Sequence, residues 1–246
     1  MARALIVGNW KMHGLAATAR ALAAEVRDGA GPLAGRAALV VCPPATVLAL
    51  VAEVLRGSAV SAGGQDCHRR TEGAHTGDIS AAMLKDAGAT HVILGHSERR
   101  AEHGETNAIV LAKVGAAIAA GLRPIVCVGE TLAERERGAA APVVREQVAE
   151  AIPEGFDAAG GAVAYEPVWA IGSGRTPTIA EIAEMHGEIR SLLTARRMGA
   201  VPILYGGSVK PANAAAILAA PEVGGALVGG ASLVAADFLA IAAAAP

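Results

Sequence analysis

The chain has 246 residues with 21 basic and 23 acidic side chains, and its formal net charge of −2 gives no positive field for nucleic acid. Hydrophobic residues make up 53% of the sequence, but alanine supplies most of the excess, and aromatic residues make up only 2% of the chain. The longest uncharged stretch, residues 37–52, is broken by Pro43 and Pro44, and the apolar tail after Phe238 is too short to span a bilayer. We therefore expect neither a nucleic-acid partner nor a membrane-spanning segment.

The cysteines are few and widely separated, at Cys42, Cys67 and Cys127. An odd number at such spacing argues against a disulfide framework or a zinc site and favours a reducing compartment. Residues 1–3 lead directly into a strand-like run, with no secretory leader before it. We expect a cytoplasmic protein.

Short apolar runs alternate with helical segments along the whole chain. The predicted strands are residues 5–8, 38–42, 59–63, 91–95, 124–129, 162–165, 202–206 and 226–229. The helical segments between them include residues 16–26, 46–55, 107–120, 142–152, 179–197 and 213–218. Nearly uninterrupted apolar strands are typical of a parallel sheet that is buried on both faces.

Eight such strands in about 250 residues predict a single-domain α/β fold, a (β/α)8 TIM barrel over residues 1–246. A doubly wound sheet is the main alternative. That fold usually carries a glycine-rich dinucleotide turn after its first strand, whereas here Gly8 is followed by Asn9, Trp10, Lys11 and Met12. The barrel is therefore favoured.

Active groups of such barrels lie where the strands end. The residues that follow the predicted strands are Asn9 and Lys11, Gln65 and Asp66, residues 96–100, Gly129 and Glu130, Glu166, residues 206–208, and residues 229–232. Lys11 offers a fixed cation, His96 a proton donor, and Glu166 a carboxylate that can act as a base on carbon. Each also has an ordinary interpretation: a surface lysine, a helix-capping histidine, and a solvent-facing carboxylate.

The segment after Glu166 has the composition of a lid over that carboxylate. It comprises Pro167, Val168, Trp169, Ala170, Ile171, Gly172, Ser173, Gly174, Arg175, Thr176 and Pro177. An apolar tip between proline and glycine margins can close over the carboxylate and exclude water. An ordinary connecting loop is the alternative.

Two glycine pairs follow the last two strands, Gly206-Gly207 and Gly229-Gly230. Glycine-rich turns before short helices expose backbone N–H groups toward an anion, and these two loops form the usual phosphate site of such barrels. The pairs also permit tight turns, which is the plainer interpretation. No histidine, carboxylate or thiol falls at metal-ligand spacing, so we expect no metal and no cofactor. The residues favour proton abstraction next to a carbonyl in a small phosphorylated metabolite.

Five segments together resemble the triosephosphate isomerase family. They are residues 9–12 (Asn-Trp-Lys-Met), 95–100 (Gly-His-Ser-Glu-Arg-Arg), 164–172, 205–209 and 229–233, and they occur in the order found in that family. The resemblance covers essentially the whole chain. It implies interconversion of dihydroxyacetone phosphate and D-glyceraldehyde 3-phosphate through an enediol(ate), in glycolysis and gluconeogenesis.

The same resemblance implies roles for single residues. Glu166 would be the carbon base and Lys11 an electrostatic stabiliser, while Asn9 and a neutral His96, at the start of a helix near Ser97, would polarise the substrate oxygens. It also implies a set of groups that bind the substrate: Asn9, Lys11 and the backbone N–H groups of Gly172, Ser208, Gly229 and Gly230. Supporting residues around these groups would be Glu98, Cys127 and Tyr205, although a small buried side chain is the plainer interpretation of Cys127.

Members of this family are homodimers, and residues 73–78 resemble the loop that reaches toward the partner's active site. His13, His75 and Thr76 are therefore expected at a dimer interface. His13 and His75 depart from the asparagine and the aromatic residue that are usual at these positions. Pro177 stands where a free N–H would meet the hydroxyl of Tyr205 on lid closure, so we predict that Tyr205 contributes less to closure here.

Two alternatives remain after the resemblance. One is an isomerase of a four-carbon ketose phosphate. The site motifs do not exclude this substrate, because phosphate binding and enediol chemistry would be similar. The other is a barrel that binds phosphate without catalysis. Such a protein would be expected to lack one of the chemical groups, yet Asn9, Lys11, His96 and Glu166 are all present.

Overall fold

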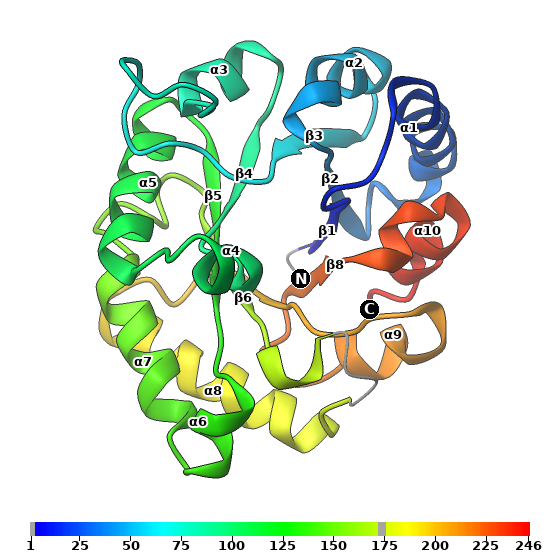
Figure 1. Cartoon of the computed structure of the whole chain (residues 1–246). Coiled ribbons are helices and arrows are strands. Elements are labelled where there is room, and N and C mark those ends of the chain that lie inside the picture. Colours follow the sequence, from blue (N-terminus) through cyan, green and yellow to red (C-terminus); the bar gives the residue numbers. More distant parts are fainter. Residues whose placement is uncertain (1–2, 172–175) are drawn as a thin grey trace.

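The strands of the computed structural model, which describes residues 3–171 and 176–246, close into a parallel barrel in the order β1 to β8 (Figure 1). The strands are β1 (Ala4–Asn9), β2 (Ala37–Cys42), β3 (Val60–Gly64), β4 (His91–Leu94), β5 (Arg123–Val128), β6 (Ala162–Tyr165), β7 (Ile203–Tyr205) and β8 (Gly225–Val228). The predicted single-domain (β/α)8 barrel is confirmed, because each strand pairs with the next and β8 pairs with β1.

Side chains alternate between two apolar cores along each strand. In β2, Leu39 and Val41 pack outward against the helices, whereas Val40 and Cys42 belong to a separate cluster with Val7. Successive strand residues point to opposite faces of a sheet, so this separate cluster fills the interior of the barrel. The continuous apolar runs in the sequence reflect these two buried faces.

Helices surround the barrel on the outside, and α1 packs against α10, so the two ends of the chain complete the ring (Figure 1). The longer helices are α1 (Ala16–Ala30), α2 (Ala45–Leu55), α5 (Asn107–Ala119), α7 (Ala140–Ala151), α8 (Ile179–Ala195), α9 (Pro211–Leu218) and α10 (Ala235–Ala243). The shorter ones are α3 (Ala81–Asp86), α4 (Ser97–Glu102) and α6 (Leu132–Glu136), with 3-10 turns at η1 (Gly31–Leu33), η2 (Val168–Ala170) and η3 (Gly230–Leu233).

The helical segments named from the sequence are present with shifted ends. Helix α1 continues past Val26 to Ala30, and α7 begins at Ala140, before the proline at which the predicted segment started. A proline fits the first turn of a helix because its missing N–H would have no partner there. Helices α3, α6 and α10 were not among the named segments; the first two are only one or two turns long.

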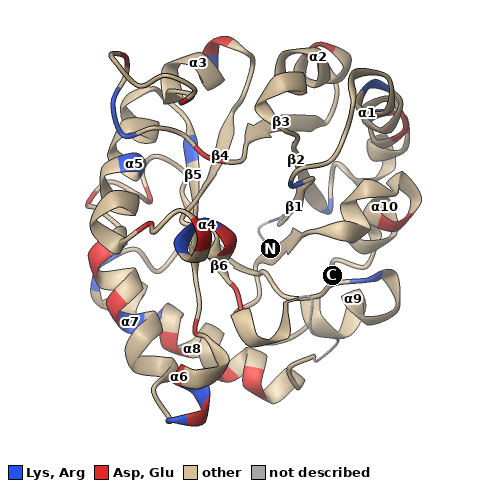
Figure 2. Ribbon diagram, in the orientation of Figure 1, with Lys and Arg blue, Asp and Glu red and all other residues tan. Residues whose placement is uncertain are grey.

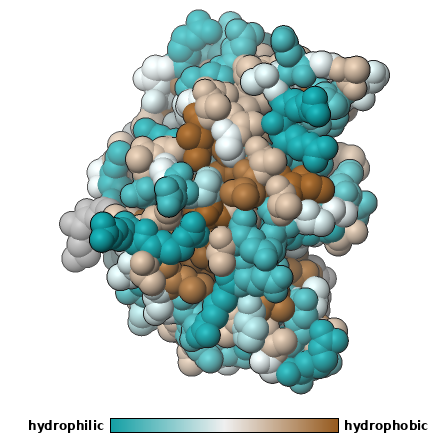
Figure 3. All heavy atoms as spheres, turned by 90° about the vertical axis from the view of Figure 1, so that its left-hand side faces the viewer, coloured by the Kyte–Doolittle hydropathy of each residue, from teal (hydrophilic) through white to brown (hydrophobic). Residues whose placement is uncertain are grey.

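Charged side chains of both signs are distributed over the helices and loops, and α4, near the middle of the barrel mouth, carries both (Figure 2). The side of the barrel seen in Figure 3 shows brown apolar patches interrupted by teal polar side chains. Within the described residues, no helix has the length and apolar character needed to cross a membrane.

Candidate active site

A cavity of about 830 Å³ opens at the carboxyl ends of the strands. Most of the residues predicted from strand ends line it: Asn9, Lys11, His96, Glu98, Glu166, Ser208, Gly229 and Gly230. The lid residues Val168 and Ile171 line it as well. Gly172 and residues 173–175 of the predicted lid lie outside the described residues. Residues that follow different strands in the sequence therefore line one connected cavity.

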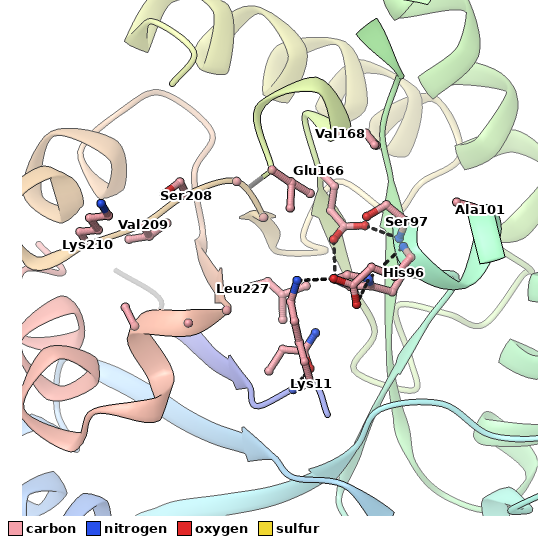
Figure 4. Close-up of a pocket in the computed structure, with 18 of the residues that line it drawn as sticks. Lys11, His96, Ser97, Ala101, Glu166, Val168, Ser208, Val209, Lys210 and Leu227 are labelled. Carbon is pink, nitrogen blue, oxygen red and sulfur yellow. Dashed lines mark hydrogen bonds and ion pairs between the residues drawn. The ribbon is translucent and has the colours of Figure 1, made fainter. Parts of the chain in front are cut away.

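Glu166 lies immediately after β6 and is almost fully buried, with 2% of its side chain exposed. One carboxylate oxygen accepts a hydrogen bond from the backbone N–H of Ser97 at 2.9 Å. The other oxygen lies 2.9 Å from Nε2 of His96 (Figure 4). The solvent-facing interpretation of this carboxylate is therefore wrong: it points into the cavity, against the residue expected to act with it.

His96 precedes helix α4, and its ring caps that helix. Nδ1 accepts a hydrogen bond from the N–H of Glu98 at 3.2 Å, which leaves the ring proton on Nε2, facing Glu166. Burial lowers the pKa of His96, but the carboxylates of Glu166 and Glu98 outweigh burial and raise that pKa above its ordinary value. The capping bond favours the neutral ring as an Nε2–H donor, while the adjacent carboxylate favours the charged ring as long as Glu166 remains against it.

Lys11 enters the cavity from the loop after β1, and its ammonium group pairs with the carboxylate of Glu98. Its backbone is in the left-handed region, with φ of 52°, which costs about 1–2 kcal/mol for a residue other than glycine. Two hydrogen bonds hold it there: its N–H donates to Oδ1 of Asn9 at 3.0 Å, and its carbonyl accepts from Gln65 at 2.7 Å. Strain held in this way is typical of a functional position.

The position of Glu166 depends on the absence of side chains at two neighbouring glycines. A Cβ at Gly129 would stand 1.7 Å from the carbonyl oxygen of Glu166, and one at Gly206 would stand 2.9 Å from its Cγ. The backbone of Glu166 is also fixed by donation to the carbonyl of Val128 at 2.7 Å. Both glycines therefore allow neighbouring strands to approach the carboxylate closely.

On the side of the cavity opposite Glu166 lie Ser208, Val209 and Lys210, beyond β7 (Figure 4). Gly229 and Gly230 border the same region at the start of η3, and Lys11 approaches within 3.5 Å of the Cβ position of Gly229. Ser232 is fully buried and donates to the carbonyl of Gly229 at 2.7 Å, which fixes this turn. Glycine-rich turns beside a lysine form a suitable cradle for an anion.

The base of the lid is held by the buried carboxylate of Glu130. It accepts hydrogen bonds from Nε1 of Trp169 at 2.7 Å and from the hydroxyl of Tyr165 at 3.1 Å. Arg135 lies 3.1 Å from the same carboxylate, and its guanidinium stands 4.7 Å from the centre of the Trp169 ring. These contacts join the lid's tryptophan to the loop after β5. The sequence identifies Glu130 only as a residue at the end of a strand, without a role.

Two of the predicted supporting residues are buried and do not line the cavity. Cys127 lies inside the barrel, and burial, reinforced by the charge of Glu166, raises the pKa of its thiol. Burial also raises the pKa of the Tyr205 hydroxyl, which has no hydrogen-bond partner among the described residues. The third, Glu98, contacts both Lys11 and His96.

Several residues that line the cavity were not chosen from the sequence. They are Ala101, Glu102, Val209, Lys210, Pro211, Leu227 and Asp237. Ala101, Glu102, Pro211 and Asp237 lie within helices and Leu227 lies inside a strand, so the strand-end rule does not select them. Lys210 follows the Gly206-Gly207 turn in the sequence. A second lysine so close to the predicted phosphate site is a signal in the sequence that could have identified it as a cavity residue.

The residues predicted for a dimer interface do not line the cavity. His13 and Thr76 are exposed and His75 is half-buried. Met12 and Leu15 are 94% and 81% exposed, and Met83 at α3 is 55% exposed. Met12 and Leu15, which lie next to His13 in the chain, are large exposed apolar side chains of the kind found at interaction surfaces.

The closed barrel and the groups at its mouth place the chain in the class of (β/α)8-barrel enzymes. The sequence model of the family described as "Triosephosphate isomerase" matches residues 4–245. Triosephosphate isomerase from Xanthobacter flavus is 60% identical, with 98% of this chain and 96% of that protein aligned. The chain belongs to the triosephosphate isomerase family.

Further comparisons agree on the family and on the fold. Triosephosphate isomerase from Afipia carboxidovorans is 59% identical, with 99% of this chain and 98% of that protein aligned. The crystal structure of triosephosphate isomerase from Bartonella henselae superposes with a TM-score of 0.91 at 44% identity and covers 99% of both chains.

Proposed function

We propose that this protein interconverts dihydroxyacetone phosphate and D-glyceraldehyde 3-phosphate, an intramolecular aldose–ketose isomerisation in glycolysis and gluconeogenesis. The observation that carries the proposal is the buried carboxylate of Glu166 beside Nε2 of His96, in a cavity that also contains Lys11 and the glycine-rich turns. The names of the relatives support a three-carbon substrate, so the four-carbon alternative is not favoured.

In the proposed reaction, Glu166 removes a proton from the carbon next to the substrate carbonyl. Its near-complete burial limits competing hydration of the carboxylate, and its contact with the Ser97 N–H defines one resting position. The same carboxylic acid then returns the proton to the neighbouring carbon. The hydroxyl proton on the first carbon's oxygen also moves to the former carbonyl oxygen, relayed by Nε2 of His96, so the new carbonyl forms where the hydroxyl stood and no external acid, oxidant or cofactor is consumed.

The negative charge that develops on the substrate oxygens needs donors that are already in place. His96 would donate through Nε2, whose proton is fixed there by the hydrogen bond that Nδ1 accepts. Asn9 and Lys11 would approach from the end of β1, with the lysine side chain supplying a positive charge. Such preorganised donors contribute more to the transition state than to the bound substrate.

The phosphate group would occupy the side of the cavity lined by Ser208, Gly229 and Gly230. Its distance from the reacting carbon would be fixed by the shape of the cavity, so binding energy at the phosphate would orient the substrate for proton transfer. We include Gly172 in this site by its place in the sequence. Val168 and Ile171, which line the cavity, would cover the substrate when the lid closes.

We further propose that the protein acts in the cytoplasm as a homodimer. The exposed Met12, Leu15 and Met83 support an apolar interface that includes His13, His75 and Thr76. Burying these large side chains against a second copy would remove apolar surface from water. Sedimentation equilibrium would give twice the chain mass for a dimer, and the chain mass alone would contradict this part of the proposal.

A direct assay tests the reaction and the substrate together. Dihydroxyacetone phosphate is added to chelator-treated protein without cofactor, and glyceraldehyde 3-phosphate is followed through a coupled dehydrogenase. We expect rapid turnover and a specificity constant for this substrate that exceeds the constant for four-carbon ketose phosphates. A larger constant for a four-carbon substrate would reassign the substrate, and no turnover by the folded protein would contradict the proposed reaction.

A further inference from the structure

At the end of β5, the side chain of Gln147 binds both backbone groups of Gly129. The N–H of Gly129 donates to Oε1 of Gln147 at 2.7 Å, and Nε2 of Gln147 donates to the carbonyl of Gly129 at 3.0 Å. Strand β5 itself ends at Val128, so Gly129 has left the ladder of the sheet. One primary amide thus satisfies the donor and the acceptor that a neighbouring strand would otherwise pair.

Gln147 reaches Gly129 from α7, which packs against the outside of β5 (Figure 1). The buried side chains of this helix are Val144, Val148 and Ala151, and Gln147 lies on the same face at helical spacing. A polar side chain within an apolar stripe loses contact with water and needs hydrogen-bond partners in the protein. Gly129 supplies these partners, so α7 and the end of β5 are joined by a polar contact as well as by apolar packing.

The backbone of Gly129 in turn lies directly against that of Glu166. A Cβ at Gly129 would stand 1.7 Å from the carbonyl oxygen of Glu166, so no space separates the two backbones. The N–H of Glu166 donates to the carbonyl of Val128 at 2.7 Å. Two residues further on, the N–H of Val168 donates to the carbonyl of Glu130 at 3.1 Å. The segment centred on Gly129 therefore supports the backbone at and after Glu166, and a shift of this segment must move the carboxylate.

We propose that Gln147 is a positioning residue for the carboxylate of Glu166: by fixing Gly129, it holds Glu166 in contact with His96. Gln147 does not line the catalytic cavity, so it acts without touching the substrate. Glu166 follows β6 and His96 precedes α4, so the 2.9 Å between the carboxylate and Nε2 depends on how the strand ends are held. This role rests on the proposed isomerase reaction, in which Glu166 is the base, but the contact between Glu166 and His96 can be measured without turnover.

The variant Gln147→Met tests this role, because methionine keeps the length and the apolar packing of the side chain but offers no strong donor or acceptor. Gly129 then loses both partners, and the backbone of Glu166 is no longer held. A misplacement of about 1 Å can cost roughly 10²-fold in rate, so kcat should fall by at least about tenfold. KM should change by less than about threefold, because Lys11 and the glycine-rich turns proposed to bind the phosphate are untouched.

Titration of His96 by NMR supplies a second measurement, made on the protein without substrate. Burial lowers the pKa of His96 and the carboxylate of Glu166 raises it, with a net rise. Retreat of the carboxylate should therefore lower the midpoint of His96 in Gln147→Met, toward its value in Glu166→Gln. Gln147→Asn keeps the amide but withdraws it by one methylene group, so it should lower kcat and the midpoint in the same direction by smaller amounts. This milder variant decides the question if Gln147→Met does not fold.

Arg196→Met serves as the matched control, because the side chain of Arg196 also donates hydrogen bonds to two backbone carbonyls. They are the carbonyls of Val148 in α7, at 3.0 Å, and of Ile152 just after that helix, at 2.6 Å. Arg196 does not line the cavity. Its replacement should lower thermal stability, while kcat stays within about threefold of the original value and the midpoint of His96 does not move.

Circular dichroism verifies the fold of each variant. The proposal is overturned if folded Gln147→Met, or Gln147→Asn in its place, keeps the His96 midpoint of the unmodified protein or keeps kcat within about threefold of it. An equal fall of kcat and midpoint in Arg196→Met would also overturn it, because the effect would then be one of general stability. Absence of isomerase turnover in the unmodified protein would instead contradict the proposed reaction, and the His96 midpoints alone would decide the role of Gln147.

Discussion

The substitution Gly129→Ala should displace the carboxylate of Glu166 while leaving that side chain chemically unchanged. The added Cβ would stand 1.7 Å from the carbonyl oxygen of Glu166, and real Cβ contacts are essentially never below 3.0 Å, so the strands must separate locally by about 1.3 Å. A misplacement of about 1 Å can cost 10²-fold in rate, which corresponds to about 2.7 kcal/mol of activation free energy. Overpacking should also lower the free energy of unfolding by about 1–3 kcal/mol.

The matched control is Gly187→Ala in α8, where a Cβ meets nothing within 4 Å. That change should leave turnover unaltered and raise the free energy of unfolding by about 0.4–1 kcal/mol, because alanine restricts the unfolded chain. The coupled isomerase assay gives kcat and KM, and denaturant titration gives stability. If folded Gly129→Ala keeps kcat within about threefold of the original value, the close approach around Glu166 does not position the base, and the reasoning fails.

Three further predictions follow from the same cavity. Burial opposes the charge on His96, but the carboxylate of Glu166 raises the pKa of that ring. NMR titration should therefore place the midpoint of His96 above 6.5, and the midpoint should be lower in Glu166→Gln. The stability that the charged ring contributes should be present below pH 6.5 and lost as the pH rises through the midpoint. Lys11→Ala should raise KM and lower kcat, reducing kcat/KM by about 10²-fold or more, and a change in KM alone would contradict its role in the transition state. Tyr205→Phe should keep kcat within about threefold and should not lower thermal stability. The hydroxyl of Tyr205 has no hydrogen-bond partner among the described residues, and Pro177 has no N–H to donate to it. A large loss of activity at unchanged stability would refute this prediction.

The barrel was predictable because burial on both faces leaves a clear pattern in the sequence. Val40 and Val41 point to different cores, yet both must be apolar, so the strand appears as one continuous run. Short helices are harder to predict. Helix α3 has only six residues and relies on Ser80, which accepts from the N–H of Met83, for its cap. A segment of this length does not show a helical repeat.

The candidate site was predictable where function requires a residue at the end of a strand. Asn9, His96 and Glu166 each occupy such a position and line one cavity. Contacts made through loops were not predictable. The bond between Trp169 and Glu130, and the pairing of Gln147 with the backbone of Gly129, depend on the path of irregular backbone, which sequence periodicity does not encode.

The whole proposed reaction depends on the assignment of Glu166 as the base in a cofactor-free isomerisation. Its most direct test is the turnover of dihydroxyacetone phosphate by Glu166→Gln, which keeps the size of the side chain and removes its basicity. We expect a folded protein that still binds inorganic phosphate but whose turnover falls by at least about 10²–10⁴-fold. Near-normal turnover by that variant would contradict the assignment of Glu166 as the base.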